Sequence, residues 1–282
     1  MLIKTLNHKQ ILNLLPDRAL ESHKGDFGKV LLLCGSKGYT GAAALAALGA
    51  LRTGAGLVYL GVPEAIYRIE ATKLLEPVVL SLSDDSGHLS VDAIVEIDNL
   101  LQGKDALLIG PGLGQSTDVK RIVEHVLTRF QGPIVLDADG INAIQTHRDI
   151  LRGRTAPTIL TPHAGEFERI FPEYTSNRIV DAATFAQTYG VITLLKGHHS
   201  VITDGRTCYL NTTGNPGMAV GGSGDVLAGM IVSLIGQGIA PLKATAIAAW
   251  LHGAAGDICA QELGQYGMLP SDMLHVLPRL LK

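Results

Sequence analysis

The sequence predicts an α/β fold, a three-layer αβα sandwich in which helices cover both faces of a mostly parallel central sheet. Short apolar runs alternate with longer segments of helical spacing, the pattern of strands that are buried on both faces. Hydrophobic residues make up 46% of the 282 residues and aromatic residues only 5%. This mixture, rich in Ala and Gly, suits helices packed tightly on a sheet better than an all-β sandwich. No linker or internal repeat divides the chain, so we expect residues 1–282 to form a single domain.

In the first half of the chain the apolar runs are four residues long and the helical segments about three turns. The helix expected at 119–130 has its apolar side chains at Val119, Ile122, Val126 and Leu127, on one face. The expected strands are Val30–Leu33, Leu57–Leu60 and Ala106–Ile109, and the expected helices are Gly41–Thr53 and Val119–Phe130. The polar segment Asp84–Ser90 is expected to be an exposed loop.

The second half continues the alternation and ends in helices. Ser200–Thr203 and Thr207–Leu210 predict a hairpin, because Asp204-Gly205 between them suits a tight turn. The other expected strands are Ile134–Leu136, Thr158–Leu160 and Val191–Leu195, and the expected helices are Ser223–Ile235, Pro241–Glu262 and a short segment from Ser271.

Charge and cysteine content exclude several classes of protein. The formal charge is −3 and there is no long Lys/Arg run, which argues against nucleic acid or an anionic membrane as the main partner. Cys34, Cys208 and Cys259 are scattered, so neither a disulfide framework nor a zinc site is indicated. The N-terminus lacks the apolar core of a signal peptide. We therefore expect a cytoplasmic globular protein that spans no membrane.

Polar residues and glycines follow five of the predicted strands. In open α/β sheets, ligands bind at the carboxyl ends of parallel strands. We therefore expect a ligand cleft at this edge of the sheet. Its residues are Gly35-Ser36, Gly110–Gly114, Asp137–Gly140, Thr161–His163 and Lys196-Gly197.

The segment Gly214–Gly224, here called the glycine loop, precedes Asp225 and a predicted helix. Free backbone N–H groups at a helix start form an anion site, and glycines let a phosphate approach closely. Asp225 would then stand in the first helical turn, placed to take a proton from a hydroxyl that attacks phosphorus. The alternative is that the glycines serve helix packing and Asp225 caps the helix.

Other polar positions carry weaker signals. Asp137 and Asp139 either hold a metal through water, contact a sugar hydroxyl, or cap a helix near Gly140. His163 either touches ligand or is structural, and Lys196 is placed to meet a phosphate. Metal binding by the adjacent pair His198-His199 is not expected, because no third ligand is spaced with it. The chain has no GxxxxGK[ST] loop, and Gly110–Gly114 lacks the spacing of a dinucleotide fingerprint and is better suited to face a substrate.

Taken in order, these motifs resemble the ADP/ATP-dependent NAD(P)H-hydrate dehydratases, a family of the ribokinase-like superfamily. The resemblance runs from Ser22 onward and rests on the ordered set Ser22–Gly28, Gly41–Ala43, Gly110–Gly114, Asp137–Asn142, Thr161–Phe167, Lys196-Gly197 and Asn215–Leu227. It implies a nicotinamide-nucleotide repair lyase. The ring hydroxyl of the S-epimer of hydrated NADH or NADPH is phosphorylated from ADP or ATP, and phosphate then leaves to restore the double bond.

The resemblance also implies the site residues. Asp225 would be the catalytic base, and Glu166 would lie near a Mg²⁺ ion that neutralises the phosphates. The hydrated dinucleotide would be bound by Ala43, Gly112, Gly114, His163 and Asp225. The adenine nucleotide would be held by Lys196, Gly197, His198, His199, Ser200, Gly222, Ser223 and Gly224.

Two alternatives remain open. One is a kinase of the same fold acting on a vitamin precursor of the hydroxymethylpyrimidine or hydroxyethylthiazole type, and the other is a nucleotide-binding regulator without turnover. His163 stands where many vitamin kinases have Asn, which favours the dehydratase. ADP is favoured weakly over ATP, a tetramer is a family-level expectation, and epimerisation is expected to need a separate protein because few residues precede Ser22.

Overall fold

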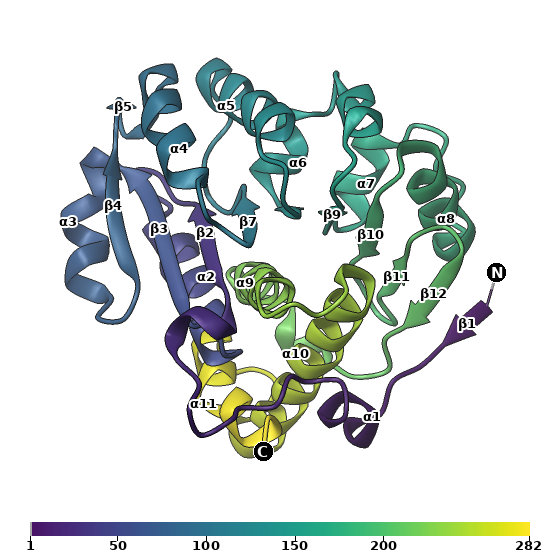
Figure 1. Ribbon diagram of the computed structural model, residues 1–282. Coiled ribbons are helices and arrows are strands. Elements are labelled where there is room, and N and C mark those ends of the chain that lie inside the picture. Colours follow the sequence, from purple (N-terminus) through teal and green to yellow (C-terminus); the bar gives the residue numbers. More distant parts are fainter. Residues whose placement is uncertain (1) are drawn as a thin grey trace.

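The computed structural model describes residues 2–282. The strands of the main sheet are β1 (Leu2–Lys4), β2 (Lys29–Leu33), β3 (Leu57–Pro63), β4 (Val78–Leu82), β7 (Ala106–Ile109), β8 (Ile134–Leu136), β9 (Thr158–Leu160), β10 (Ile192–Leu195), β11 (Val201–Thr203) and β12 (Thr207–Leu210). Their spatial order is β1-β12-β11-β10-β9-β8-β7-β2-β3-β4. β11 runs antiparallel to β10 and β12, and the other neighbours in the sheet are parallel. The expected mostly parallel sheet is therefore confirmed (Figure 1).

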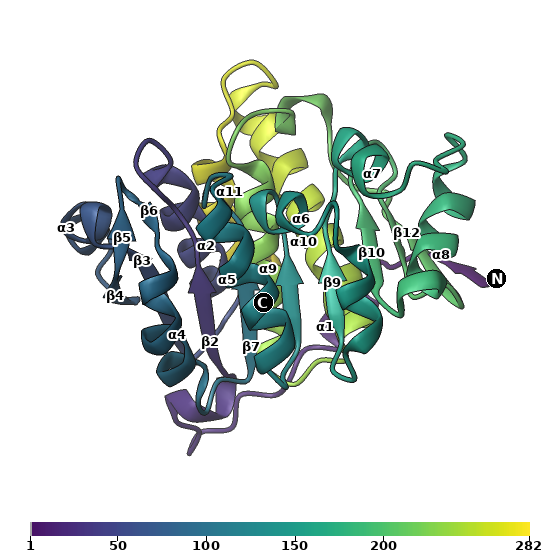
Figure 2. The same ribbon diagram turned by 90° about the horizontal axis from the view of Figure 1, so that it is seen from above.

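Helices cover both faces of this sheet, as Figures 1 and 2 show. They are α1 (His8–Leu12), α2 (Thr40–Arg52), α3 (Glu64–Lys73), α4 (Ile94–Leu101), α5 (Thr117–Arg129), α6 (Asp139–Ala143), α7 (Ala164–Ile170), α8 (Arg178–Tyr189), α9 (Ser223–Gly236), α10 (Pro241–Leu263) and α11 (Pro270–Leu280). Side chains of a strand alternate between two cores. On β2, Val30 and Leu32 belong to the core that includes residues of α2, α9, α10 and α11, while Leu31 and Leu33 belong to the core that includes residues of α4 to α8.

Helix α9 lies over the middle of the sheet, against β7, β2 and β8, and crosses α2 at very short range. A Cβ atom at Gly49 would lie 2.6 Å from the carbonyl oxygen of Val226, and one at Gly229 would collide with the carbonyl of Ala46. Only glycine allows the two backbones to approach this closely. The close crossing fixes the start of α9 at the carboxyl edge of the sheet.

The predicted strands and helices are all present, with ends within three residues of those expected. Strands β1 and β4 and helices α1, α3, α4 and α8 were not predicted from the sequence. The expectation of an exposed loop at Asp84–Ser90 is confirmed only for Asp85 and Ser86, at the tip of this segment. A small hairpin forms there, β5 (Asp84–Asp85) with β6 (His88–Leu89), and both Leu89 and Ser90 are buried. Its Gly87 carbonyl accepts a hydrogen bond from the backbone of Lys37.

Cys34, Cys208 and Cys259 are buried and unpaired. Within residues 2–282, no helix combines the length and apolarity that crossing a bilayer would need.

Candidate active site

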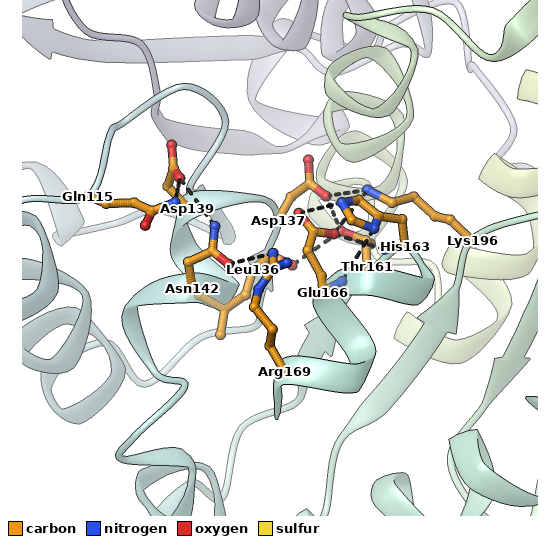
Figure 3. A network of polar contacts seen from close by, with 10 residues as sticks. All are labelled: Gln115, Leu136, Asp137, Asp139, Asn142, Thr161, His163, Glu166, Arg169 and Lys196. Carbon is orange, nitrogen blue, oxygen red and sulfur yellow. Dashed lines mark hydrogen bonds and ion pairs between the residues drawn. The ribbon is translucent and has the colours of Figure 1, made fainter. Parts of the chain in front are cut away.

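The parallel strands β8, β9 and β10 are neighbours, so the residues that follow them meet at one edge (Figure 3). The Lys196 ammonium group lies 2.9 Å from Oδ1 of Asp137, and the Thr161 hydroxyl donates to the same oxygen at 2.6 Å. Glu166, in the first turn of α7, lies 3.9 Å from Lys196. Asp137, Thr161, Glu166 and Lys196 are called the polar cluster below.

Lys196 is the cation of this cluster, and carboxylates surround it. Burial disfavours its charge, but the negative charges of Asp137, Glu166 and Asp225 outweigh this and raise the pKa of the Lys196 ammonium group. Lys196 is therefore charged at neutral pH. The Asp137 side chain is 2% exposed and that of Lys196 is 21% exposed. A ligand can therefore approach this charge only at the exposed part of Lys196.

His163 lies at the N-terminus of α7. Its ring Nδ1 accepts from the Glu166 backbone N–H at 3.3 Å, and the Glu166 carboxylate accepts from the His163 N–H at 2.8 Å. This reciprocal cap orients Glu166 toward Lys196. The His163 side chain is 57% exposed, so it has surface to offer a ligand as well as a capping role.

The end of the glycine loop lies directly over the polar cluster. Gly222 is the N-cap of α9 with φ +98°, a conformation suited to glycine, and Asp225 is in the first turn. A Cβ atom at Gly224 would lie 3.3 Å from Nζ of Lys196 and 3.9 Å from Oδ2 of Asp137. Among residues 2–282 the Ser223 N–H donates to the carbonyl of Val220 at 3.3 Å, whereas no backbone acceptor is found for the N–H groups of Gly222 and Gly224. These two N–H groups and the Lys196 charge are close enough together to bind one anion.

Asp225 has the properties of a base for neutral pH. Burial, together with the negative charges of Asp137 and Asp139, raises its pKa to about 6 although Lys196 acts in the opposite direction. Among residues 2–282 no donor forms a hydrogen bond with its carboxylate. The group is ionised at neutral pH and free to accept a proton.

On the other side of the cluster, Asp139 anchors the loop Gly110–Gly114. Its carboxylate accepts from the Gly114 N–H at 2.8 Å and from the Gln115 and Asn142 amides at 3.3 Å (Figure 3). The N-cap of α6 is Ala138, so the helix-capping alternative for Asp137 and Asp139 is wrong. Gly112 and Gly114 have φ values of +64° and +80°, and both are partly exposed.

Other predicted residues lie less directly at the cluster. Ala43 is fully buried, beside Gly35, and offers no surface in this conformation. Gly197 and Ser200 exchange hydrogen bonds in the turn after β10. His198 and His199 lie in the same turn, and their rings are stacked. The binding roles of these residues remain predictions.

Ser36, one of the predicted strand-end residues, donates to the Gly112 carbonyl at 2.8 Å. Two other residues near the site were not singled out by the sequence. The His88 ring lies where a side chain of Gly114 would be, and His252 in α10 lies 3.4 Å from the hydroxyl of Ser223. A histidine within an apolar helix was a visible signal for His252. The position of His88 depends on loop packing, which leaves no periodic pattern in the sequence.

Two surface hollows lie elsewhere. One is between the end of α5 and residues 149–156, at the opposite edge of the sheet. The other is beside Arg148, Arg152 and Arg169. Neither hollow is lined by residues of the polar cluster or by Asp225. The candidate site is therefore identified by its charged groups and their shifted pKa values rather than by the depth of a cavity.

Comparison with known proteins decides the family. A family model described as NAD(P)H-hydrate dehydratase matches residues 30–279. The chain belongs to this family. A bifunctional NAD(P)H-hydrate repair enzyme of Moorella thermoacetica is 44% identical over 95% of the chain, which covers 52% of that enzyme. The ADP-dependent (S)-NAD(P)H-hydrate dehydratase of Bacillus subtilis is 38% identical over 95% of the chain and 94% of its own length.

The fold agrees with the family. A crystal structure of the ADP/ATP-dependent NAD(P)H-hydrate dehydratase from Bacillus subtilis, co-crystallised with ATP and Mg²⁺, has a TM-score of 0.84. It is 34% identical, with 97% of this chain and 96% of that one covered. Ribokinase-like proteins are among the other structural neighbours, which confirms the expected fold class. This chain spans about half the length of the bifunctional relatives that it matches.

Proposed function

We propose that this chain dehydrates the S-epimer of hydrated NADH or NADPH, using ADP or ATP as phosphoryl donor, and so restores the reduced coenzyme. The observation that carries the proposal is the position of Gly224 and Asp225 directly over Lys196 and Asp137. An anion site, a fixed cation and an ionised base converge there. Phosphoryl transfer to a hydroxyl needs these three components.

In the proposed reaction the ring hydroxyl attacks the terminal phosphorus of the nucleotide. Asp225 takes the hydroxyl proton as the new O–P bond forms, and the bond from phosphorus to the departing nucleotide breaks, giving AMP from ADP or ADP from ATP. The C–O bond of the phosphorylated ring then breaks, with electrons supplied by the ring nitrogen, and a ring proton is lost as the double bond forms. Phosphorylation promotes this step because phosphate is a good leaving group and hydroxide is a poor one.

The N–H groups of Gly222 and Gly224 would stabilise the transferring phosphoryl group, together with Lys196. A Mg²⁺ ion would neutralise the nucleotide phosphates. Residues 2–282 contain no group of three or more His, Cys, Asp or Glu side chains arranged to hold a metal alone. One or two carboxylates with phosphates and waters suffice for Mg²⁺, and Glu166 with Oδ2 of Asp137 offers such a set.

The vitamin-precursor kinase is the second candidate, since it would use the same loop and the same Asp225. One assay separates the candidates. Hydrated NADH is incubated with Mg²⁺ and either ADP or ATP, and the near-ultraviolet absorbance of the reduced ring is followed. We expect recovery that depends on nucleotide. No recovery with either donor, together with phosphorylation of a hydroxymethylpyrimidine or hydroxyethylthiazole, would establish the kinase instead.

We further propose one domain over residues 1–282, a cytoplasmic location, a homo-oligomer and dependence on a separate epimerase. Light scattering on the purified chain tests the assembly. The R-epimer of hydrated NADH tests the last point, because it should persist until an epimerase is added.

A further inference from the structure

The start of the glycine loop is bound to α10 through Asp257. Oδ2 of Asp257 accepts from the Gly214 N–H at 2.9 Å, and Oδ1 accepts from the Asn215 side-chain amide at 3.0 Å. The Asn215 side chain in turn caps the short turn Pro216–Met218 by accepting from the Gly217 N–H at 3.0 Å. One carboxylate therefore sets the direction in which the loop leaves the sheet.

The shape of α10 fits the same segment. The Thr213 hydroxyl donates to the carbonyl of Trp250 at 2.8 Å. A Cβ atom at Gly253 would collide with Thr213, and one at Gly256 would collide with the Met218 side chain. Residues at these spacings share one face of a helix. This face of α10 is therefore built to receive the loop.

The end of the loop meets α10 again at His252. Its Nε2 lies 3.4 Å from the Ser223 hydroxyl, and both residues are buried. Burial lowers the pKa of His252 to about 4, so the ring is neutral at physiological pH. A neutral ring presents one donor and one acceptor, and can hold the hydroxyl without adding charge beside Lys196.

We propose that Asp257 and His252 are positioning residues that hold the two ends of the glycine loop on α10, so that the N–H groups of Gly222 and Gly224 face the nucleotide phosphates. The inference rests on the proposed use of a nucleotide at this loop. Neither residue touches the reacting atoms. Their effect is on the geometry of the loop, and therefore on nucleotide affinity more than on binding of the hydrated coenzyme.

The test compares Asp257→Ala with Glu262→Gln on the same helix. Glu262 forms an exposed ion pair with Arg279 at 3.4 Å, and within residues 2–282 its carboxylate forms no hydrogen bond with the loop. Binding of ADP with Mg²⁺ is measured by calorimetry, and KM for hydrated NADH is measured at saturating nucleotide. We expect Asp257→Ala to weaken ADP binding about tenfold, as loss of two hydrogen bonds suggests, with KM for hydrated NADH unchanged. Glu262→Gln should bind like wild type.

His252 is tested by a pair of variants because its removal opens the core. His252→Leu should also weaken ADP binding, whereas His252→Gln, which can still bond the Ser223 hydroxyl, should recover most of the affinity. Equal ADP affinity in Asp257→Ala and wild type would overturn the inference, as would a parallel loss of affinity for both substrates with a lowered melting temperature. Failure of the wild-type chain to bind ADP or ATP would instead contradict the proposed function.

Discussion

The ammonium group of Lys196 lies 2.9 Å from Oδ1 of Asp137, across a strand that contributes Thr161 to the same oxygen. Asp137 directly follows β8 and Lys196 directly follows β10, so the contact joins the ends of two strands that are not neighbours. It places one fixed positive charge beneath the first turn of α9. The pair therefore connects two strand ends directly beneath the proposed phosphate site.

Removing Lys196 should destabilise the protein. Lys196→Met leaves the carboxylates of Asp137 and Glu166 buried without a cation, which should lower the free energy of unfolding by about 2–3 kcal/mol. Adding Asp137→Asn should recover part of that loss, since the two residues are coupled. Urea unfolding of both single variants and the double variant measures the coupling. Arg279→Met, which removes an exposed ion pair, is the control and should unfold like wild type. If the losses of unfolding free energy in Lys196→Met and Asp137→Asn simply add in the double variant, the two residues are not coupled.

Gly224 and Gly221 form a matched pair for testing the anion site. A Cβ atom at Gly224 would press on Lys196, which two carboxylates hold in place, whereas one at Gly221 would meet nothing within 4 Å. We expect Gly224→Ala to lower kcat/KM by at least about tenfold, because the phosphoryl group and Lys196 no longer fit together. Gly221→Ala should stay within about twofold of wild type, since its site is open. Equal effects of the two substitutions in steady-state assays would show that the contact with Lys196 is unimportant.

The pKa of Asp225 sets an acid limit on the reaction. The base must be ionised, and its pKa is raised to about 6, chiefly by burial and by the charge of Asp137. We therefore expect kcat/KM to be flat above this value and to fall about tenfold per pH unit below it. The pH–rate profile of the wild-type chain measures this, with circular dichroism as a check that folding persists. A limb near pH 4 would mean that the carboxylate is not desolvated as the structure indicates.

Asp225→Asn should abolish turnover, leave nucleotide binding largely intact and stabilise the fold. The ordinary pKa of the group is 3.8 and that in the folded chain is about 6, so ionised Asp225 favours the unfolded state. The free energy of unfolding of the wild-type chain should therefore fall as pH rises from about 4 to about 6, because Asp225 loses its proton over this range. The variant should show no such fall. Above that window the variant should be more stable by about 1–2 kcal/mol, a value reduced for partial exposure. Thermal unfolding without nucleotide at several pH values tests it.

The sequence predicted the centre of the sheet well and its borders poorly. Strands β7, β8 and β9 are buried on both faces, so their apolar runs give their ends directly. Strand β4 lies at the sheet edge with Val78 exposed, and α3 buries only Ile66 and Glu70. Elements that bury so little surface leave a weak periodic signal.

For the site, the sequence indicated which strand ends would meet, because parallel neighbours share an edge. It could not indicate that Asp137 would bind Lys196 while Asp139 turned to the Gly114 N–H, two residues apart in the chain. Nor could it place His252 beside Ser223, since that contact depends on how α10 packs on α9. Such side-chain choices follow from packing between distant segments rather than from local pattern.

If phosphorylation makes the ring hydroxyl leave, nucleotide consumption and coenzyme repair must occur in a fixed ratio within a single reaction. Hydrated NADH, ADP and Mg²⁺ are incubated with the chain, and NADH, AMP and inorganic phosphate are quantified in the same sample. We expect one AMP and one phosphate for each NADH restored, and none of the three products with Asp225→Asn. Restoration of NADH without nucleotide consumption, or a phosphorylated product that accumulates without release of phosphate, would contradict this mechanism.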